Sequence, residues 1–285
     1  MNPVIRAQGL TRRYGSTLAL DSVDLEIPAG RIVGLIGPNG AGKTTALKSI
    51  LGLGPFEGQL EVLGLDPRRQ RARLMEQVCF IADVAVLPRW LRVRQALDIT
   101  EGLHPRFSRE KAEGFLRQTE IKHDSKISAL SKGMVAQLHL ALVMAIDARL
   151  LVLDEPTLGL DIIYRKEFYN ALLNDYFDGE RTILLTTHQV EEIEHILTHL
   201  MFINHGRIVL DESMDALGEK FLELATRPDR AEQARGLGPL AERQGLGRHY
   251  FIFENRTRAE LEPLGEIKVP GVADLFVATI RRTAS

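Results

Sequence analysis

Short apolar runs recur along the chain and are separated by stretches whose apolar residues follow a helical spacing. The clearest runs are residues 32–36, 78–81, 150–153 and 182–186. Their aliphatic and β-branched residues are typical of strands that are buried on both faces by covering helices. The pattern therefore predicts an α/β fold built around a buried sheet.

The N-terminal part of the chain alternates apolar and polar residues instead. Residues 4–10 and 18–27 follow a rough period of two, which predicts two strands of an antiparallel layer. Between them, Arg12-Arg13-Tyr14-Gly15 is expected to form a loop. Tyr14 on that loop has two open interpretations, because an exposed aromatic ring either stacks on a purine or covers the edge of the sheet.

Residues 84–148 have a helical composition, which Pro88 and the pair His104-Pro105 interrupt. We therefore expect a helical insertion between the second and third buried runs. Residues 164–177 predict a further amphipathic helix before the last buried run.

The last third of the chain carries weaker patterns. Residues 200–204 and 208–210 predict a terminal hairpin, and residues 250–254 and 267–269 predict two more strands. Beyond Leu217 we expect a small α+β appendage. Three roles remain open for it, namely regulation, a dimer contact or a solvated cap.

Composition narrows the class of protein. The apolar fraction of 45% and the charged fraction of 26% are ordinary for a folded protein. The formal charge of −2 gives no basic excess, so no nucleic-acid partner is expected. The single cysteine, Cys79, excludes an internal disulfide. The sequence shows no apolar leader pattern, and no apolar run reaches the roughly 18 residues needed to span a bilayer. These features predict a cytoplasmic protein.

A glycine-rich loop follows the first buried run and precedes a stretch with helical spacing. Its residues are Gly37, Pro38, Asn39, Gly40, Ala41, Gly42, Lys43, Thr44 and Thr45. Glycines in such a loop aim successive backbone N–H groups inward, and the following helix start adds its positive dipole end, so the loop is expected to bind polyphosphate. Lys43 would reach the β- and γ-phosphates, Thr44 would ligate a magnesium ion, and Thr45 would add a phosphate contact.

Polar residues follow two other buried runs. Asp154 and Glu155 end the run 150–153, and His188 stands just past the run 182–186. Ligands of α/β proteins bind at the carboxyl ends of the strands. We therefore expect Asp154 to hold magnesium through water, Glu155 to act as general base toward the attacking water, and His188 to contact the γ-phosphate. The alternative for Asp154 and Glu155 is a charged cap on a buried strand without a catalytic or metal-binding role.

The order of these elements resembles the nucleotide-binding subunit of ABC transporters over roughly residues 3–217. The resemblance rests on Tyr14, the loop 37–45, Leu130-Ser131-Lys132-Gly133-Met134, residues 150–155, Leu160-Asp161 and His188. It implies a P-loop NTPase core with an antiparallel β subdomain and a helical signature subdomain at about 84–148. The ATPase domain would span residues 1–217, and the α+β appendage residues 218–285.

The resemblance also implies how ATP and magnesium would be bound. Ser131 and Gly133, at the start of a helix, would bind the γ-phosphate of a nucleotide held on a second subunit. The implied assembly is a head-to-tail homodimer with two composite sites, and Asp161 would communicate between them. An integral membrane permease is the implied further partner, which would place the chain peripherally on the inner face of the cell membrane.

Three residues depart from the family pattern. Lys132 and Met134 replace a glycine and a glutamine of the signature, while its serine and second glycine remain. Asp83 stands where the family usually has a glutamine that touches magnesium and the membrane partner. Since an aspartate oxygen is a suitable ligand for a hard cation, Asp83 is expected to ligate magnesium. Signatures with a lysine occur in suspected exporters, which favours export.

Two other classes of ABC ATPase compete with a transporter subunit. A soluble member could act on a cytosolic assembly, such as iron–sulfur cluster formation or translation, and another could associate with DNA. DNA-associated members carry long coiled-coil or zinc insertions between the phosphate loop and the signature, and the stretch between these motifs is too short for one here. Translation-type members usually hold two cassettes, but this sequence has no internal repeat. The transporter interpretation is therefore preferred.

Overall fold

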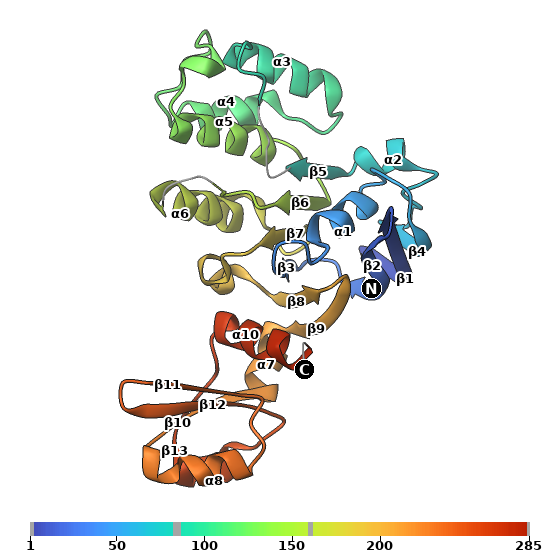
Figure 1. Cartoon of the computed structure of the whole chain (residues 1–285). Helices are drawn as coiled ribbons and strands as arrows, with labels where there is room; N and C mark the ends of the chain where they lie inside the picture. Colours follow the sequence, from blue (N-terminus) through green and yellow to red (C-terminus); the bar gives the residue numbers. More distant parts are fainter. Residues whose placement is uncertain (1–2, 82–86, 159–161, 284–285) are drawn as a thin grey trace.

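The computed structural model describes residues 3–81, 87–158 and 162–283. Its centre is a six-stranded sheet with the strand order β5-β6-β7-β3-β8-β9 (Figure 1). The pairs from β5 to β8 are parallel, and β9 runs antiparallel to β8. The strands are β3 (Ile32–Ile36), β5 (Val78–Ile81), β6 (Leu150–Asp154), β7 (Thr182–Thr187), β8 (His199–Asn204) and β9 (Arg207–Ser213). The apolar runs of the sequence form the predicted buried sheet.

The two faces of this sheet are covered by different layers, because alternate side chains of a strand point to opposite faces. Leu151 and Leu153 belong to a cluster shared with α6, the π turn after it and α10. Leu150 and Val152 belong to a second cluster, shared with α1 and the antiparallel sheet. The covering helical elements are α1 (Lys43–Ile50), α6 (Ile162–Ala171), the π turn Leu172–Tyr176 and α10 (Val272–Thr283).

The predicted antiparallel layer is confirmed as a three-stranded sheet in the order β2-β1-β4. Its strands are β1 (Ile5–Tyr14), β2 (Thr17–Ile27) and β4 (Glu57–Val62). The expected loop at Arg12-Arg13-Tyr14-Gly15 is wrong, because β1 continues to Tyr14 and only Gly15 and Ser16 form the turn. Register shifts along β1 interrupt its alternation of apolar and polar residues, which hid the second half of the strand.

The helical region before β6 has its own small core, which includes Leu97, Leu116 and Leu138. This finding confirms the predicted helical insertion within the described residues. Its elements are α3 (Val93–Leu103), α4 (Arg109–Leu116), the 3-10 turn Ile127–Ala129 and α5 (Lys132–Met144), and α2 (Arg71–Met75) lies before β5.

The predicted hairpin is confirmed as β8 and β9, but it is not terminal. The chain continues through α7 into a second antiparallel sheet with the order β11-β12-β10-β13. Sequence patterns predicted two of these four strands, and β10 and β11 were missed. The elements are α7 (Met214–Lys220), β10 (Phe221–Thr226), α8 (Ala231–Gly236), β11 (Ala241–Gly245), β12 (Arg248–Glu254), α9 (Arg258–Leu261) and β13 (Gly265–Lys268).

Helix α10 returns from this second sheet to the central one (Figure 1). The ring of Phe276 packs edge-on against Phe202 of β8, with 5.1 Å between the ring centroids. The backbone N–H of Val272 donates a hydrogen bond to Glu194. The C-terminal region is therefore attached to the central sheet at both of its ends. Among the described residues, no helix is both long enough and apolar enough to span a membrane.

Candidate nucleotide-binding site

The glycine-rich loop connects β3 to α1, as the sequence predicted. Gly40 and Gly42 have φ angles of +80° and +112°, a region that side chains with a Cβ rarely adopt. A Cβ on Gly37 would lie 2.3 Å from the carbonyl oxygen of Ile203, and one on Gly42 would lie 2.6 Å from that of Ala19. Glycine is thus required both by the shape of the loop and by the strands packed against it.

Lys43 is the first residue of α1, and its side chain is largely buried. The Lys43 ammonium donates hydrogen bonds to the carbonyl oxygens of Gly37, at 2.7 Å, and of Pro38. It also lies 3.8 Å from a carboxylate oxygen of Glu155. Burial lowers the pKa of Lys43, while the carboxylates of Glu155 and Asp154 act in the opposite direction. The loop therefore holds a cation next to its own backbone.

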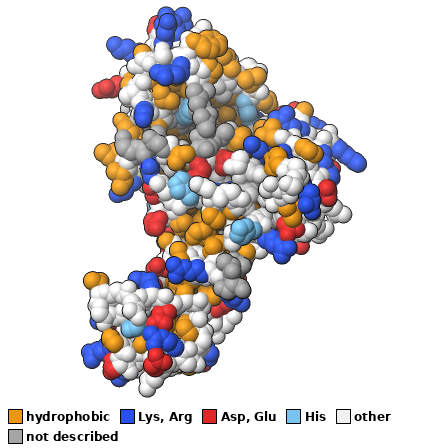
Figure 2. Space-filling model, viewed as in Figure 1, with side chains coloured by type: hydrophobic (Ala, Val, Ile, Leu, Met, Phe, Trp, Pro, Cys, Tyr) orange, Lys and Arg blue, Asp and Glu red, His pale blue; other side chains and the backbone are white. Residues whose placement is uncertain are grey.

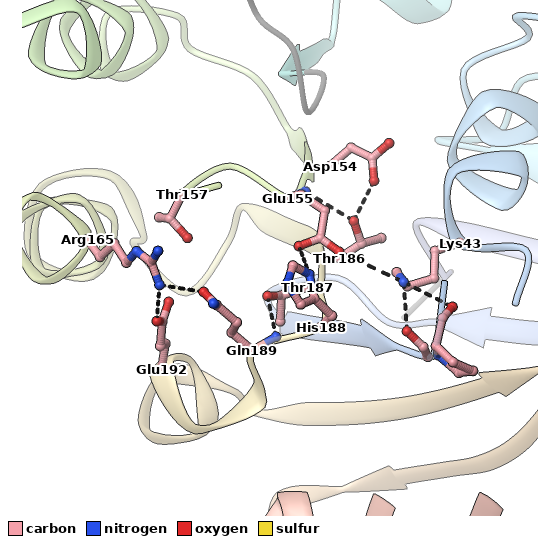
Figure 3. A network of polar contacts seen from close by, with 12 residues as sticks. Lys43, Asp154, Glu155, Thr157, Arg165, Thr186, Thr187, His188, Gln189 and Glu192 are labelled. Atoms are coloured by element: carbon pink, nitrogen blue, oxygen red, sulfur yellow. Dashed lines mark hydrogen bonds and ion pairs between the residues drawn. The ribbon is translucent and has the colours of Figure 1, made fainter. Parts of the chain in front are cut away.

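Asp154 is the last residue of β6 and is almost fully buried. Its carboxylate accepts a hydrogen bond of 2.6 Å from the hydroxyl of Thr186 on the neighbouring strand β7. This bond fixes one carboxylate oxygen, and Figure 3 shows the other directed away from Thr186. Thr186 was not singled out from the sequence, although its place next to Thr187 at the end of a buried run was a usable signal.

Glu155 adopts a left-handed backbone conformation with φ of +49°. Its N–H is held by the carbonyl and hydroxyl oxygens of Thr186, at 3.1 and 3.2 Å. Strained backbone at the end of a central strand is typical of functional sites. The strained turn directs the Glu155 side chain toward the phosphate loop and β7.

The Glu155 carboxylate lies between a lysine and a histidine (Figure 3). One of its oxygens is 2.9 Å from Nδ1 of His188, and the other faces Lys43. The sequence predicted that Glu155 and His188 share one edge of the sheet, and the structure brings them into contact. Three segments distant in the sequence therefore meet at a single carboxylate.

Tyr14 is the last residue of β1, and the phosphate loop packs against Ala19 of the paired strand β2. The buried guanidinium of Arg12 stacks on the Tyr14 ring at 4.7 Å from its centroid. The ring is still half exposed. Arg12 covers part of the ring and leaves the rest exposed, so stacking on a purine stays a prediction.

Replacing Tyr14 by Ala is expected to weaken ATP binding about tenfold, since stacking of a base on an aromatic ring contributes about 1–3 kcal/mol. Tyr14→Phe should bind like the parent chain. Tyr250 is a matched control, because its ring is likewise stacked by an arginine, Arg243, but lies in the C-terminal sheet. Titration with a fluorescent ATP analogue measures the effect. Equal affinity of Tyr14→Ala and the parent would support the sheet-edge interpretation.

The predicted signature residues lie at the start of α5. Ser131 caps this helix by accepting a hydrogen bond from the N–H of Met134, and its side chain is exposed. Gly133 is buried, and a Cβ there would lie 2.3 Å from the ring of Tyr164. A larger residue at position 133 would therefore require the end of the Tyr164 side chain to move. The described contacts within the chain do not join Ser131 to the phosphate loop.

Two predicted site residues, Asp83 and Asp161, lie outside the described residues. The described donors for magnesium are the exposed hydroxyl of Thr44 and the carboxylate of Asp154. Among the described residues, no group of three or more His, Cys, Asp or Glu side chains could hold a metal by itself. Magnesium commonly keeps several waters and binds through one or two carboxylates plus substrate phosphates. The donor set therefore fits a magnesium ion that arrives with ATP.

A phosphate loop between β3 and α1, with carboxylates at the end of a neighbouring strand, defines a nucleotide-binding protein of the α/β class. Comparison with known proteins specifies the family. A family model described as ABC transporter matches residues 20–158. The chain is 34% identical over 219 residues to the daunorubicin resistance ATP-binding protein DrrA2 of Streptomyces coeruleorubidus, covering 75% of this chain and 68% of that protein. It is 33% identical over 279 residues to the Nod factor export ATP-binding protein I of Cupriavidus metallidurans, covering 92% and 89%.

Solved structures agree with this result. A structure of an ATP-binding subunit of an ABC transporter superposes with a TM-score of 0.67 at 25% identity, covering 75% of this chain and 91% of the other. A nucleotide-free ATP-binding cassette shares the fold, with a TM-score of 0.64 at 20% identity and coverage of 75% and 92%. The chain belongs to the ABC transporter family and is an ATP-binding subunit with the ATPase activity of transport systems. The preferred transporter interpretation is confirmed. Subunits of this family work with membrane permeases.

Proposed function

We propose that two copies of this chain bind and hydrolyse Mg-ATP between them and thereby power export by a separately encoded membrane permease. The observation that carries the hydrolytic part is the Glu155 carboxylate, held between Lys43 and His188 at the end of β6. The chain would act from the cytoplasmic side, bound peripherally to the inner face of the membrane. Residues 1–217 would form the ATPase domain and 218–285 the appendage.

Hydrolysis requires a base next to the attacking water and cations next to the phosphates. The Glu155 carboxylate takes a proton from the water as its oxygen attacks the γ-phosphorus, and the bond to the bridging oxygen of ADP breaks. Lys43 moves from its loop carbonyls to the β- and γ-phosphates. His188, which contacts Glu155 through Nδ1, presents the opposite side of its ring to the γ-phosphate. Thr44, Asp154 and Asp83 would hold a magnesium ion, which would neutralise charge on the phosphates.

Asp83→Ala is expected to raise the magnesium concentration that supports half-maximal hydrolysis about tenfold, because one oxygen ligand is lost. Asp83→Gln, which restores the usual residue of the family, should leave a functional site, and Asn should be intermediate. The measurement is a magnesium titration of ATP hydrolysis at fixed ATP. Unchanged magnesium dependence in all three variants would reject Asp83 as a ligand.

The proposed second subunit would supply the exposed hydroxyl of Ser131 and the start of α5 to the partner's nucleotide. The start of α6 also exposes apolar side chains, since Ile162 and Ile163 are 70% and 65% exposed. These two residues directly follow Asp161, the proposed contact between the two sites, in the sequence. Burial of this apolar pair against a second copy would favour the dimer.

The proposed permease-binding surface lies on the helical region. Ile99 and Leu103, one helical turn apart on α3, are exposed, and Trp90 just before α3 is 73% exposed. Figure 2 shows hydrophobic side chains gathered over this part of the molecule. Apolar surface rimmed by charged residues is typical of a protein interface.

Trp90→Ala is expected to reduce the amount of chain recovered with permease-containing membranes about tenfold or more, because a buried tryptophan commonly dominates interface energy. Leu246 is a matched control, since it is 99% exposed at the opposite end of the molecule, in the β11–β12 turn. The measurement is sedimentation of tagged chain with membranes. Equal loss for Leu246→Ala and Trp90→Ala would argue against a specific surface.

Export is supported by the relatives, whose names describe daunorubicin resistance, Nod factor export and bacitracin transport. The direct test is purification of the tagged full chain from detergent-solubilised membranes, followed by identification of what accompanies it. A multi-span membrane protein that stimulates hydrolysis is expected. Recovery with a soluble assembly complex and no membrane protein would contradict the proposal.

A further inference from the structure

Helix α6 contacts both catalytic segments of the proposed site. On one side, the hydroxyl of Thr157, two residues after Glu155, is 3.1 Å from the hydroxyl of Tyr169 on α6. Burial raises the pKa of Tyr169 to about 12, so this phenol stays protonated and able to donate. The segment that carries Glu155 is thereby joined to the helix.

On the other side, Arg165 of α6 contacts the turn that follows His188 (Figure 3). Its guanidinium donates to the side-chain oxygen of Gln189 at 2.5 Å and to a carboxylate oxygen of Glu192. The N–H of Gln189 is in turn bonded to the hydroxyl of Thr187 at 3.0 Å. The residues on either side of His188 are therefore both held, and Arg165 provides the link to the helix.

The surroundings of this link are closed to solvent to a large extent. The Arg165 and Glu192 side chains are 19% and 28% exposed. The second carboxylate oxygen of Glu192 is buried and has no hydrogen-bond partner among the described residues. The Arg165 guanidinium is therefore held at Glu192, because moving it away would leave a largely buried carboxylate without a cation, which costs free energy.

His188 itself is 42% exposed, and its described polar contact is with Glu155. Besides β7 and this contact, the turn that follows His188 is the element that can set its position relative to Glu155. We propose that Arg165 is a positioning residue, which fixes His188 relative to Glu155 by tying the turn after His188 to α6. This inference rests on the proposed role of His188 in hydrolysis. Because α6 begins at the exposed pair Ile162 and Ile163, a second subunit bound at this pair would affect the position of His188 through the same link.

Arg165→Gln in the full chain is the test, since the shorter side chain loses both the charge that pairs with Glu192 and the reach of the guanidinium. We expect kcat for ATP to fall about tenfold with KM and ATP affinity within about twofold, because small displacements of a positioned group impair the transition state more than binding. In a His188→Ala background the same substitution should change kcat less than about twofold, since the two residues act as one unit. Arg235→Gln is the control, because Arg235 likewise bridges two side chains, in its case the carboxylates of Glu232 and Glu242 in the C-terminal region.

A second variant tests whether Arg165 has a purely structural role. Arg165→Gln alone leaves the Glu192 carboxylate without its cation. Adding Glu192→Gln removes that carboxylate and should recover the melting temperature. The kcat should remain low, because the turn is still not tied to α6. Recovery of kcat together with stability would overturn the inference. So would an equal loss from Arg165→Gln with and without His188. By contrast, parent-like hydrolysis by His188→Ala alone would overturn the proposed role of His188 itself.

Discussion

Lys43→Ala is expected to reduce ATP hydrolysis to below about 1% of the parent rate, because donors that stabilise developing charge contribute about 10²–10³-fold to catalysis. The ammonium of Lys43 is the cation that the loop holds at its own carbonyls, 3.8 Å from Glu155. Without it, the loop would keep only its backbone N–H groups and the predicted contact of Thr45 for the phosphates. ATP affinity should therefore fall as well.

The matched control for this variant is Lys48→Ala. Lys48 lies on the same helix α1, but its side chain is exposed on the surface. Phosphate release from ATP and titration with a fluorescent analogue measure the two effects. Parent-like turnover by Lys43→Ala would contradict the assignment of the loop, and a comparable loss in Lys48→Ala would indicate damage to the helix.

Glu155→Gln is expected to slow hydrolysis by about 10²–10⁴-fold while ATP binding is preserved, since the amide keeps the shape of the side chain but cannot accept the proton. The variant should accumulate as an ATP-bound dimer, because binding proceeds and the step that releases the dimer does not. Light scattering with ATP and magnesium should then report about twice the chain mass of 31.9 kDa.

Glu191→Gln is the control, because Glu191 lies near His188 in the sequence and its side chain is exposed. It should hydrolyse ATP like the parent and show no dimer trapping. Rapid hydrolysis by Glu155→Gln would assign the base to another group. Loss of ATP binding in Glu155→Gln would mean that the carboxylate acts in binding and not as the base.

The site could be predicted from the sequence where residues suited to phosphate chemistry stand at the carboxyl end of a predicted buried strand. Carboxyl ends of adjacent parallel strands lie at one edge of a sheet, so the phosphate loop, Glu155 and His188 were expected to meet, and β3, β6 and β7 bring them together. Lys43 next to Glu155 follows from the same rule. The catalytic roles of these residues remain predictions.

Other features depend on packing that the chain pattern does not encode. Arg165, Gln189 and Glu192 are ordinary surface-type residues in sequence, and their meeting requires the docking of α6 on the turn after His188. Strand β11, residues 241–245, is polar and has no buried residue, so no alternation marks it as a strand. Tyr14 was assigned to a loop because the register shifts of β1 remove the period of two.

The composite site is tested most directly by mixing two inactive chains. Lys43→Ala has a defective loop and an intact Ser131, whereas Ser131→Phe has an intact loop and an apolar ring in place of the hydroxyl at the start of α5. Because Ser131 also caps α5, the folding of its variant is checked by thermal unfolding, where a loss of about 1 kcal/mol is expected.

Each chain alone should hydrolyse ATP at or near background. In the mixture about half of the pairs should contain one chain of each kind, and each such pair has one site with an intact loop and an intact serine. The account predicts that phosphate release returns on mixing and grows with the fraction of mixed pairs. Continued inactivity of the mixture, or full activity of Ser131→Phe alone, would contradict a site built from two chains.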